Sequence, residues 1–405
     1  MSINVIIMYI MMGFLLIGAL DRVFNQFGGA EKVLCYVKLG WLGRGIGGAG
    51  QQFEEGFMAM GALGLAMVGI TALAPVLASV LGPLIIPLYE SVGASPAMFA
   101  GTLLANDMGG FPLAKVIAGP DTAAWLYSGL LLGAMMGPTL VFTIPVALGI
   151  IDNADRRFLA LGTLAGIVTV PVGTFVGGLV AMYSSIEVNG VAVPFTLPML
   201  LVNIIPVAVV AVLIALGLKF IPEKIIAGFE VFSKLLVAMI TIALAAAVVN
   251  FTVGWTLIPG MDPIFMNADA GDMPGHVMRA IEVIGSIACV LLGAYPMVLL
   301  LTRWFGGPLL SVGKLLGMNG DAAAGMVASL ANVIPMLGMY SKMDDRGKVI
   351  NSAFAVSAAF ALGDHLGFTA ANMPVMIFPV LVGKLVGGTT AVIVAMLIAP
   401  KSANK

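Results

Sequence analysis

The chain has 405 residues, of which 60% are hydrophobic and only 10% are charged, and its formal net charge is -1. Soluble domains average roughly 45–50% apolar and about 25% charged residues, so the composition excludes an ordinary soluble protein. The scattered basic residues and the small net charge argue against nucleic acid as a partner. Two cysteines and two histidines are too few for a disulfide framework or a convincing metal site. We therefore expect a membrane protein without metal or cofactor.

Eleven apolar segments follow one another along the chain, and a helix needs about 20 such residues to cross a bilayer. No Lys or Arg precedes Arg22, so the charged start of a cleaved signal peptide is missing and the first segment is expected to be a retained helix. The sequence predicts an all-α, polytopic membrane protein with about 9 to 11 transmembrane helices. The segments lie near residues 3–20, 57–80, 82–118, 122–151, 158–183, 196–218, 231–257, 279–301, 308–340, 349–372 and 375–399.

Two of these segments, 82–118 and 308–340, are long and interrupted. Glycine, proline and short polar residues mark turns and helix ends, so each segment is expected to be a re-entrant hairpin. The interrupting residues are Gly93, Ser95 and Pro96 in the first segment, and Gly317, Asn319, Gly320 and Asp321 in the second.

Short matches in the same order relate the two halves of the chain and predict an internal repeat. The paired positions are Pro83 with Pro308, Asn106 with Asn332, Gly137 with Gly363, Thr143 with Thr369, and Gly173 and Gly177 with Gly383 and Gly387. The predicted organisation is a first transmembrane repeat over 1–185, a connecting helix with loops over 186–227, and a second transmembrane repeat over 228–405. The alternative is that Gly, Pro and Leu are common enough in this chain to align by chance.

The placement of Lys and Arg predicts the orientation, because basic residues favour cytoplasmic loops. The loop 258–276 has three aspartates and no base, and is predicted to be outside. Nine full crossings and two hairpins satisfy all the bases, and the two halves are then inverted, as in many secondary transporters with interrupted helices. Eleven full crossings would put Arg156 and Arg157 outside, against the rule. The bases predicted to be inside are Arg22, Lys32, Lys38, Arg44, Arg156, Arg157, Lys219, Lys224, Lys234, Arg303, Lys342, Arg346, Lys348, Lys401 and Lys405.

Two acidic residues within apolar segments are the leading candidates for a substrate site. A charge at the bilayer centre costs roughly 2.5–3.5 kcal/mol on insertion scales, so a buried acid needs a partner or a function. Asp107 is followed by Gly109 and Gly110, and Asp364 is preceded by Gly363. These glycines allow another backbone or a solute to come close. Such acids are suited to attracting an amine.

Amide, imidazole and hydroxyl side chains complete the candidate site. Asn106 and Asn332 are related by the repeat and could bind a hydroxyl group, although hydrogen bonding between helices is an equal alternative. His365 could relay a proton or serve as a structural partner of its neighbouring aspartate. Thr143 and Thr369, which the repeat also relates, are the remaining candidates.

A few further side chains have two interpretations each. Trp125, Tyr127, Tyr295 and Tyr340 could form an aromatic face for a cation, but anchoring at the membrane boundary is the more common role of such residues. Lys384 lies deep in the last segment and either reaches toward the interface or pairs with an acid that the sequence does not identify. No nucleophile, metal or cofactor constellation is present, so an enzyme is not expected.

Three motifs resemble the ethanolamine-utilisation transporter family, EutH. They run from Ser95 to Gly101, from Leu104 to Ala114 and from Gly363 to Thr369, and the similarity extends over the whole chain, including an amphipathic loop from Gln51 to Phe57. The resemblance implies a permease of the bacterial inner membrane that imports ethanolamine for catabolism, by alternating access. It does not identify the binding residues.

Several alternatives remain open at this stage. The chain could carry another small polar solute, such as a nucleoside or a carboxylate, although an anion carrier should present bases and helix N-termini rather than acids. Transport could be passive or coupled to H⁺ or Na⁺. Membrane lipid is an expected partner, and a homodimer is the expected oligomer.

Overall fold

The computed structural model describes residues 2–267 and 278–400, and its elements are helices apart from one small hairpin. The elements of the first half are α1 (Ile3–Asn25), α2 (Ala30–Cys35), α3 (Gly40–Ile46), α4 (Ala49–Glu90), α5 (Met98–Leu103), η1 (Asn106–Gly110), α6 (Phe111–Ala118), α7 (Thr122–Leu126), η2 (Tyr127–Leu131), η3 (Leu132–Ala134), α8 (Met136–Pro138), η4 (Thr139–Thr143), α9 (Ile144–Ile150), η5 (Asn153–Asp155), α10 (Arg156–Ile167) and α11 (Val170–Tyr183).

The hairpin and a single long helix separate this half from the second. Strands β1 (Glu187–Val188) and β2 (Val191–Ala192) are antiparallel, and Asn189 and Gly190 form the turn with positive φ angles of 51° and 76°. The later elements are α12 (Leu197–Phe220), α13 (Pro222–Val253), α14 (Ala280–Leu315), α15 (Gly320–Ser329), α16 (Val333–Gly338), η7 (Tyr340–Lys342), α17 (Asp345–Ala358), α18 (Asp364–Asn372), η8 (Pro374–Met376) and α19 (Ile377–Ile398).

The predicted all-α, polytopic fold is confirmed. Within the described residues, eight helical stretches are long and apolar enough to cross a membrane, and they correspond to eight of the eleven predicted segments. The other three predicted segments, 82–118, 308–340 and 349–372, are divided by breaks within or next to them. Nine crossings with two re-entrant hairpins therefore stay a prediction.

The ends of two long helices differ from the prediction. Gly48, with a left-handed φ of 89°, precedes the first residue of α4, so Gln51 to Phe57 form helical turns and the loop predicted there is wrong. The helix continues to Glu90 through three prolines. The sequence interpretation divided this stretch into two segments, between residues 80 and 82. A proline removes one backbone hydrogen bond, but in an apolar environment the neighbouring bonds keep the chain helical.

The predicted interruptions are confirmed as helix breaks. α4 ends at Glu90 and α5 begins at Met98, and α14 ends at Leu315 and α15 begins at Gly320. Each interrupted segment also contains a second break, at residues 104–105 and at residues 330–332. These second breaks come immediately before or at the repeat-related asparagines.

A tight glycine contact joins α11 to α19. A Cβ atom added to Gly173 would lie 2.7 Å from the carbonyl oxygen of Gly383, and one added to Gly383 would lie 2.9 Å from the carbonyl oxygen of Gly173. Gly177 and Gly387 extend the contact on either side. The contact is reciprocal, with the same residues in both roles, and it allows the two backbones to touch as small residues do in membrane helices.

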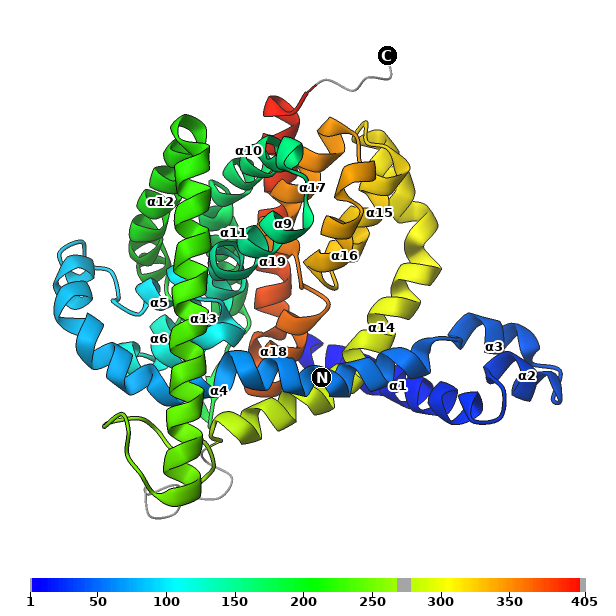
Figure 1. Ribbon diagram of the computed structural model, residues 1–405, viewed down its shortest axis with the longest axis horizontal. Helices are drawn as coiled ribbons and strands as arrows, with labels where there is room; N and C mark the ends of the chain where they lie inside the picture. Colours follow the sequence, from blue (N-terminus) through cyan, green and yellow to red (C-terminus); the bar gives the residue numbers. More distant parts are fainter. Residues whose placement is uncertain (1, 268–277, 401–405) are drawn as a thin grey trace.

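A second pair of contacts follows the same pattern. Gly69 of α4 lies against the backbone of Ile240 in α13, and Gly293 of α14 lies against the backbone of Met11 in α1. The helices α4 and α14 also pack extensively on each other (Figure 1). Such matched pairs are what an inverted repeat requires, and the repeat itself stays a prediction.

Basic residues gather toward one end of the bundle. The turn between α12 and α13, the start of α10 and the end of α19 all lie toward the upper side of Figure 1, and Lys219, Arg156 and Arg157 lie in or next to the first two of these segments. Tyr127 and Tyr340 are 0% and 1% exposed. Their predicted role as boundary anchors is therefore wrong, because a buried ring does not reach the interface.

The glycine contact between α11 and α19 gives a test of the packing. Gly173→Ala is expected to destabilise the protein by about 1–3 kcal/mol, because its methyl group overpacks a backbone-to-backbone contact. Thermal unfolding of the purified protein in detergent measures the change. Gly149→Ala is the control, because that glycine lies on the exposed side of α9 with open space around its Cα. Equal unfolding temperatures for the two variants would contradict the contact.

Candidate functional site

Each half of the chain brings two helix breaks face to face. In the first half, a Cβ atom on Gly137 would touch the carbonyl of Leu104, so the short helix α8 lies against the break that follows α5. In the second half, Gly363 lies in the same way against the carbonyl of Ala331. The glycines at these two positions let the backbones approach where no side chain fits. Four interrupted segments therefore meet inside the molecule.

Backbone hydrogen bonds hold the second pair of breaks together. The N–H of Phe360 donates to the carbonyl of Ser329 at 2.9 Å, and the N–H of Leu362 donates to the carbonyl of Leu330 at 2.9 Å. Phe360 adopts a left-handed φ of 63°, which is a strained conformation for a bulky residue. The strain and the hydrogen bonds place Asp364 directly after the break, as the first residue of α18.

Asp364 is held by two side chains from other elements. The hydroxyl of Tyr295 in α14 donates to its Oδ1 at 2.7 Å, and the amide of Asn332 donates to its Oδ2 at 3.4 Å. The carboxylate is half-buried rather than fully covered. It therefore keeps acceptor capacity for a further donor. Tyr295 is thus part of the candidate site, and the prediction that it is a boundary anchor is wrong.

Asp107 lies in η1, between α5 and α6, and is also half-buried. Met108 and Gly109 have non-helical backbone angles, so the chain turns sharply just after this aspartate. Its carboxylate interacts electrostatically with both Asp364 and Lys384. The two predicted acids therefore come together, one from each half of the chain, around a common interior position.

Lys384 is the base of this cluster and is only 1% exposed. Its Nζ donates to the carbonyl of Ala134, which belongs to an irregular stretch of the first half, and lies 3.0 Å from Nδ1 of His365. The partner that the sequence did not identify is thus a histidine and a backbone carbonyl. The nearby acid, Asp107, supplies the opposite charge. His365 is buried, and its ring packs against the ring of Phe360 in a tilted arrangement, with 5.0 Å between centroids.

The predicted amides and hydroxyls have different surroundings. Oδ1 of Asn332 accepts from the N–H of Ile334 and caps α16, whereas Oδ1 of Asn106, the first residue of η1, accepts from the N–H of the adjacent Asp107. The Nδ2 of Asn106 is buried without a hydrogen-bond partner among the described residues. Thr369 donates to the carbonyl of His365 within its own helix, and Thr143 is buried in η4.

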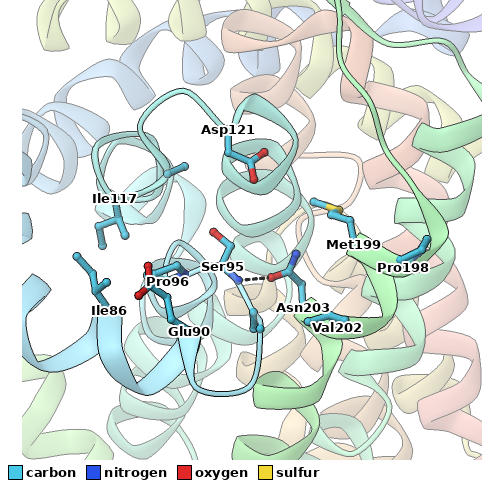
Figure 2. A pocket seen from close by; sticks show the side chains of 13 residues that line it. Ile86, Glu90, Ser95, Pro96, Ile117, Asp121, Pro198, Met199, Val202 and Asn203 are labelled. Carbon is cyan, nitrogen blue, oxygen red and sulfur yellow. Dashed lines mark hydrogen bonds between the residues drawn. The ribbon is translucent and has the colours of Figure 1, made fainter.

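A separate surface pocket lies away from the two aspartates. Its volume is about 630 Å³, and it opens between the end of α4, the α6–α7 turn and the start of α12. Figure 2 shows Asn203 accepting from the N–H of Ser95 across the pocket, at 2.6 Å, with Glu90 and Asp121 nearby. None of the predicted site residues lines it. In the described part of the chain no three acid, His or Cys side chains gather as metal ligands would.

Comparison with known proteins identifies the family. Residues 3–398 match the family described as "Ethanolamine utilisation protein, EutH". The chain belongs to the EutH family. It is 71% identical over 401 residues to a "Probable ethanolamine permease EutH" of Escherichia coli (strain K12), a match that covers 99% of this chain and 97% of that protein. No solved structure matches it.

Other relatives extend the EutH family to more distant bacteria. A protein of the same name from Salmonella typhimurium is also 71% identical, with the same coverage. Another, from Listeria monocytogenes, is 51% identical over 407 residues, covering 100% of this chain and 96% of that protein. The predicted resemblance to the EutH family is confirmed. Together with the eight candidate spans, these permease relatives support a multi-pass membrane transporter.

The charge cluster predicts a coupling between two substitutions. Asp107→Asn should lower the free energy of unfolding less in a Lys384→Met background than in the wild type, because each change removes one charge of an interacting pair. Groups in one such network couple by about 0.5–3 kcal/mol. Denaturant unfolding of the four proteins in detergent measures the coupling.

The control cycle combines Asp107→Asn with a substitution at a different lysine, Lys115. This lysine interacts with Asp262 and with the ring of Trp125. Asp107→Asn and Lys115→Met should be additive. If the Lys384 cycle is additive as well, the two charges do not interact and the cluster is not an electrostatic unit.

Proposed function

We propose that this member of the EutH family is a carrier that imports ethanolamine across the bacterial inner membrane for catabolism. The observation that carries the proposal is the meeting of Asp107 and Asp364, one from each half, at helix breaks in the interior. The permease names of its relatives supply the substrate. We place the chain among carriers rather than enzymes for the same reasons.

The charges of the cluster match a single ammonium group. With both aspartates ionised and Lys384 protonated, the three side chains carry a net charge of -1, and one ethanolammonium ion neutralises them. A buried charge that is left uncompensated is strongly unfavourable. In this charge state the site favours a monovalent cation over a neutral solute or an anion, and a carboxylate carrier is the weaker alternative.

Hydrogen-bonding groups near the aspartates match the rest of the substrate. The ammonium group has three N–H donors for the two half-buried carboxylates. The hydroxyl group can accept from the buried Nδ2 of Asn106, which has no partner among the described residues. An unpaired buried donor costs about 1–3 kcal/mol, and a bound hydroxyl recovers part of it. Thr143, Thr369 and His365 support the site from its second layer.

Alternating access is the mechanism we propose for this site. Interrupted helices that meet at a central site, in two halves of opposite orientation, are the recurring design of secondary transporters. In that arrangement one unit moves against the other and exposes the substrate to each side in turn. His365 and Lys384 are then the groups to test for coupling to protons.

Uptake into proteoliposomes tests the proposal. The wild type should show saturable uptake of labelled ethanolamine, and Asp107→Asn and Asp364→Asn should each lower kcat/KM by about tenfold or more. The reason is that a charge-assisted hydrogen bond contributes about 1.5–3 kcal/mol. Imposed pH and Na⁺ gradients show whether either ion is coupled.

Matched controls separate a site effect from misfolding. Glu90→Gln removes an exposed carboxylate of the separate pocket and should transport like the wild type. Unlabelled amino alcohols should compete with ethanolamine, whereas ethylene glycol and glycolate should not. Wild-type uptake no faster than in empty liposomes refutes ethanolamine transport, and competition by glycolate favours an anion carrier.

A further inference from the structure

A second cavity lies at the end of the bundle that is predicted to face the cytoplasm. Its volume is about 760 Å³, and it opens between the start of α10 and the turn that joins α12 to α13. These segments meet toward the upper side of Figure 1. None of the residues of the carboxylate site lines this cavity, so it has no part in the substrate site described above.

Three basic side chains are among the residues that line this cavity. Arg156, Arg157 and Lys219 line it, and none of the three forms an ion pair within the part of the chain that the structure describes. One of the two acids in the lining, Glu230, is already paired with Lys234 at 2.7 Å. The remaining acid is Glu223. The cavity therefore offers an excess of positive charge to a ligand.

Arg156 has hydrogen-bond donors that the described residues leave unused. Its Nη2 donates to the carbonyl of Leu148 at 3.3 Å, but its Nε is buried and has no hydrogen-bond partner among the described residues. A guanidinium group has five donors in a planar fork that suits phosphate oxygens. Arg156 is also the first residue of α10, where the helix N-terminus adds partial positive charge.

Most of the other residues that line the cavity are apolar. Ala160, Leu161 and Leu164 follow Arg156 along α10, and Ile226 faces them from α13. A free phosphate ion has no apolar part that could contact these side chains. A lipid places its phosphate among bases and its acyl chains along hydrocarbon, so this combination of charge and apolar surface is the one that a phospholipid needs.

We propose that this cavity binds an anionic phospholipid of the cytoplasmic leaflet, with its phosphodiester at Arg156, Arg157 and Lys219. Basic pockets between membrane helices on this side are known sites for anionic headgroups. The lipid occupies the junction of α10 with the α12–α13 pair. Its binding does not depend on what the carrier transports.

Native mass spectrometry of the full-length protein tests the proposal. The probes are phosphatidylglycerol and phosphatidylcholine with the same acyl chains, and inorganic phosphate. The wild type should retain one phosphatidylglycerol at concentrations where phosphatidylcholine is lost. The triple variant Arg156→Gln/Arg157→Gln/Lys219→Gln should bind it at least about tenfold more weakly, because each base near a membrane surface adds about fivefold to the affinity for an anionic lipid.

Two further variants keep the test decisive. Lys224→Gln removes an exposed base of the same turn that does not line the cavity, and should bind like the wild type. Ala227→Trp fills the cavity from an exposed position and leaves every charge in place, so it should also abolish binding. Equal retention of both lipids, retention in the triple or Ala227→Trp variant, or displacement by millimolar phosphate would overturn the proposal.

Discussion

Backbone amides and carbonyls inside a membrane must find partners within the protein, because no water reaches them there. This chain breaks several of its helices and satisfies the exposed groups by placing breaks against each other. Phe360 and Leu362 donate to the carbonyls of Ser329 and Leu330, and Lys384 donates to the carbonyl of Ala134. The positions of the two aspartates depend on these contacts, because each follows directly on a paired break.

The same contacts explain how charged side chains persist in an apolar bundle. Asp364 accepts hydrogen bonds from the phenol of Tyr295 and the amide of Asn332, and Asp107 is attracted electrostatically by Lys384. Lys384, in turn, has a carbonyl and an imidazole nitrogen within reach. Each charge is thus supported by groups from other segments, and the cluster links α14, α18 and α19 to the first half of the chain.

Sequence reasoning predicted the fold class, most of the apolar segments and the two interrupted regions, because these depend on composition and on Gly, Pro and Asn signals that are local. It also selected Asp107 and Asp364, since an acid in an apolar segment is costly wherever it lies. It missed the role of Tyr295 and the partners of Lys384. Tyr295 and Asp364 are 69 residues apart in the chain, and Lys384 and His365 are 19 residues apart. No local sequence pattern encodes such contacts.

The errors of the sequence interpretation have a common physical origin. The apolar run of α4 was divided between residues 80 and 82, and the polar run from Gln51 was taken as a loop, yet both belong to one continuous helix. Local propensity is a weak guide where the surrounding hydrocarbon penalises every unpaired backbone group. The buried tyrosines, Tyr127 and Tyr340, were misplaced because ring chemistry alone does not distinguish an interface from a core.

The glycine contact between α11 and α19 limits how the molecule can move. The two backbones are in direct contact at Gly173 and Gly383, and the contact extends over about one turn of each helix. No side chains lie between them there, so sliding one helix along the other would make the backbones clash. Any conformational change that preserves this contact must carry the two helices together as a rigid body, although one comes from each half of the chain. Such a change then takes place around the α11–α19 pair rather than within it.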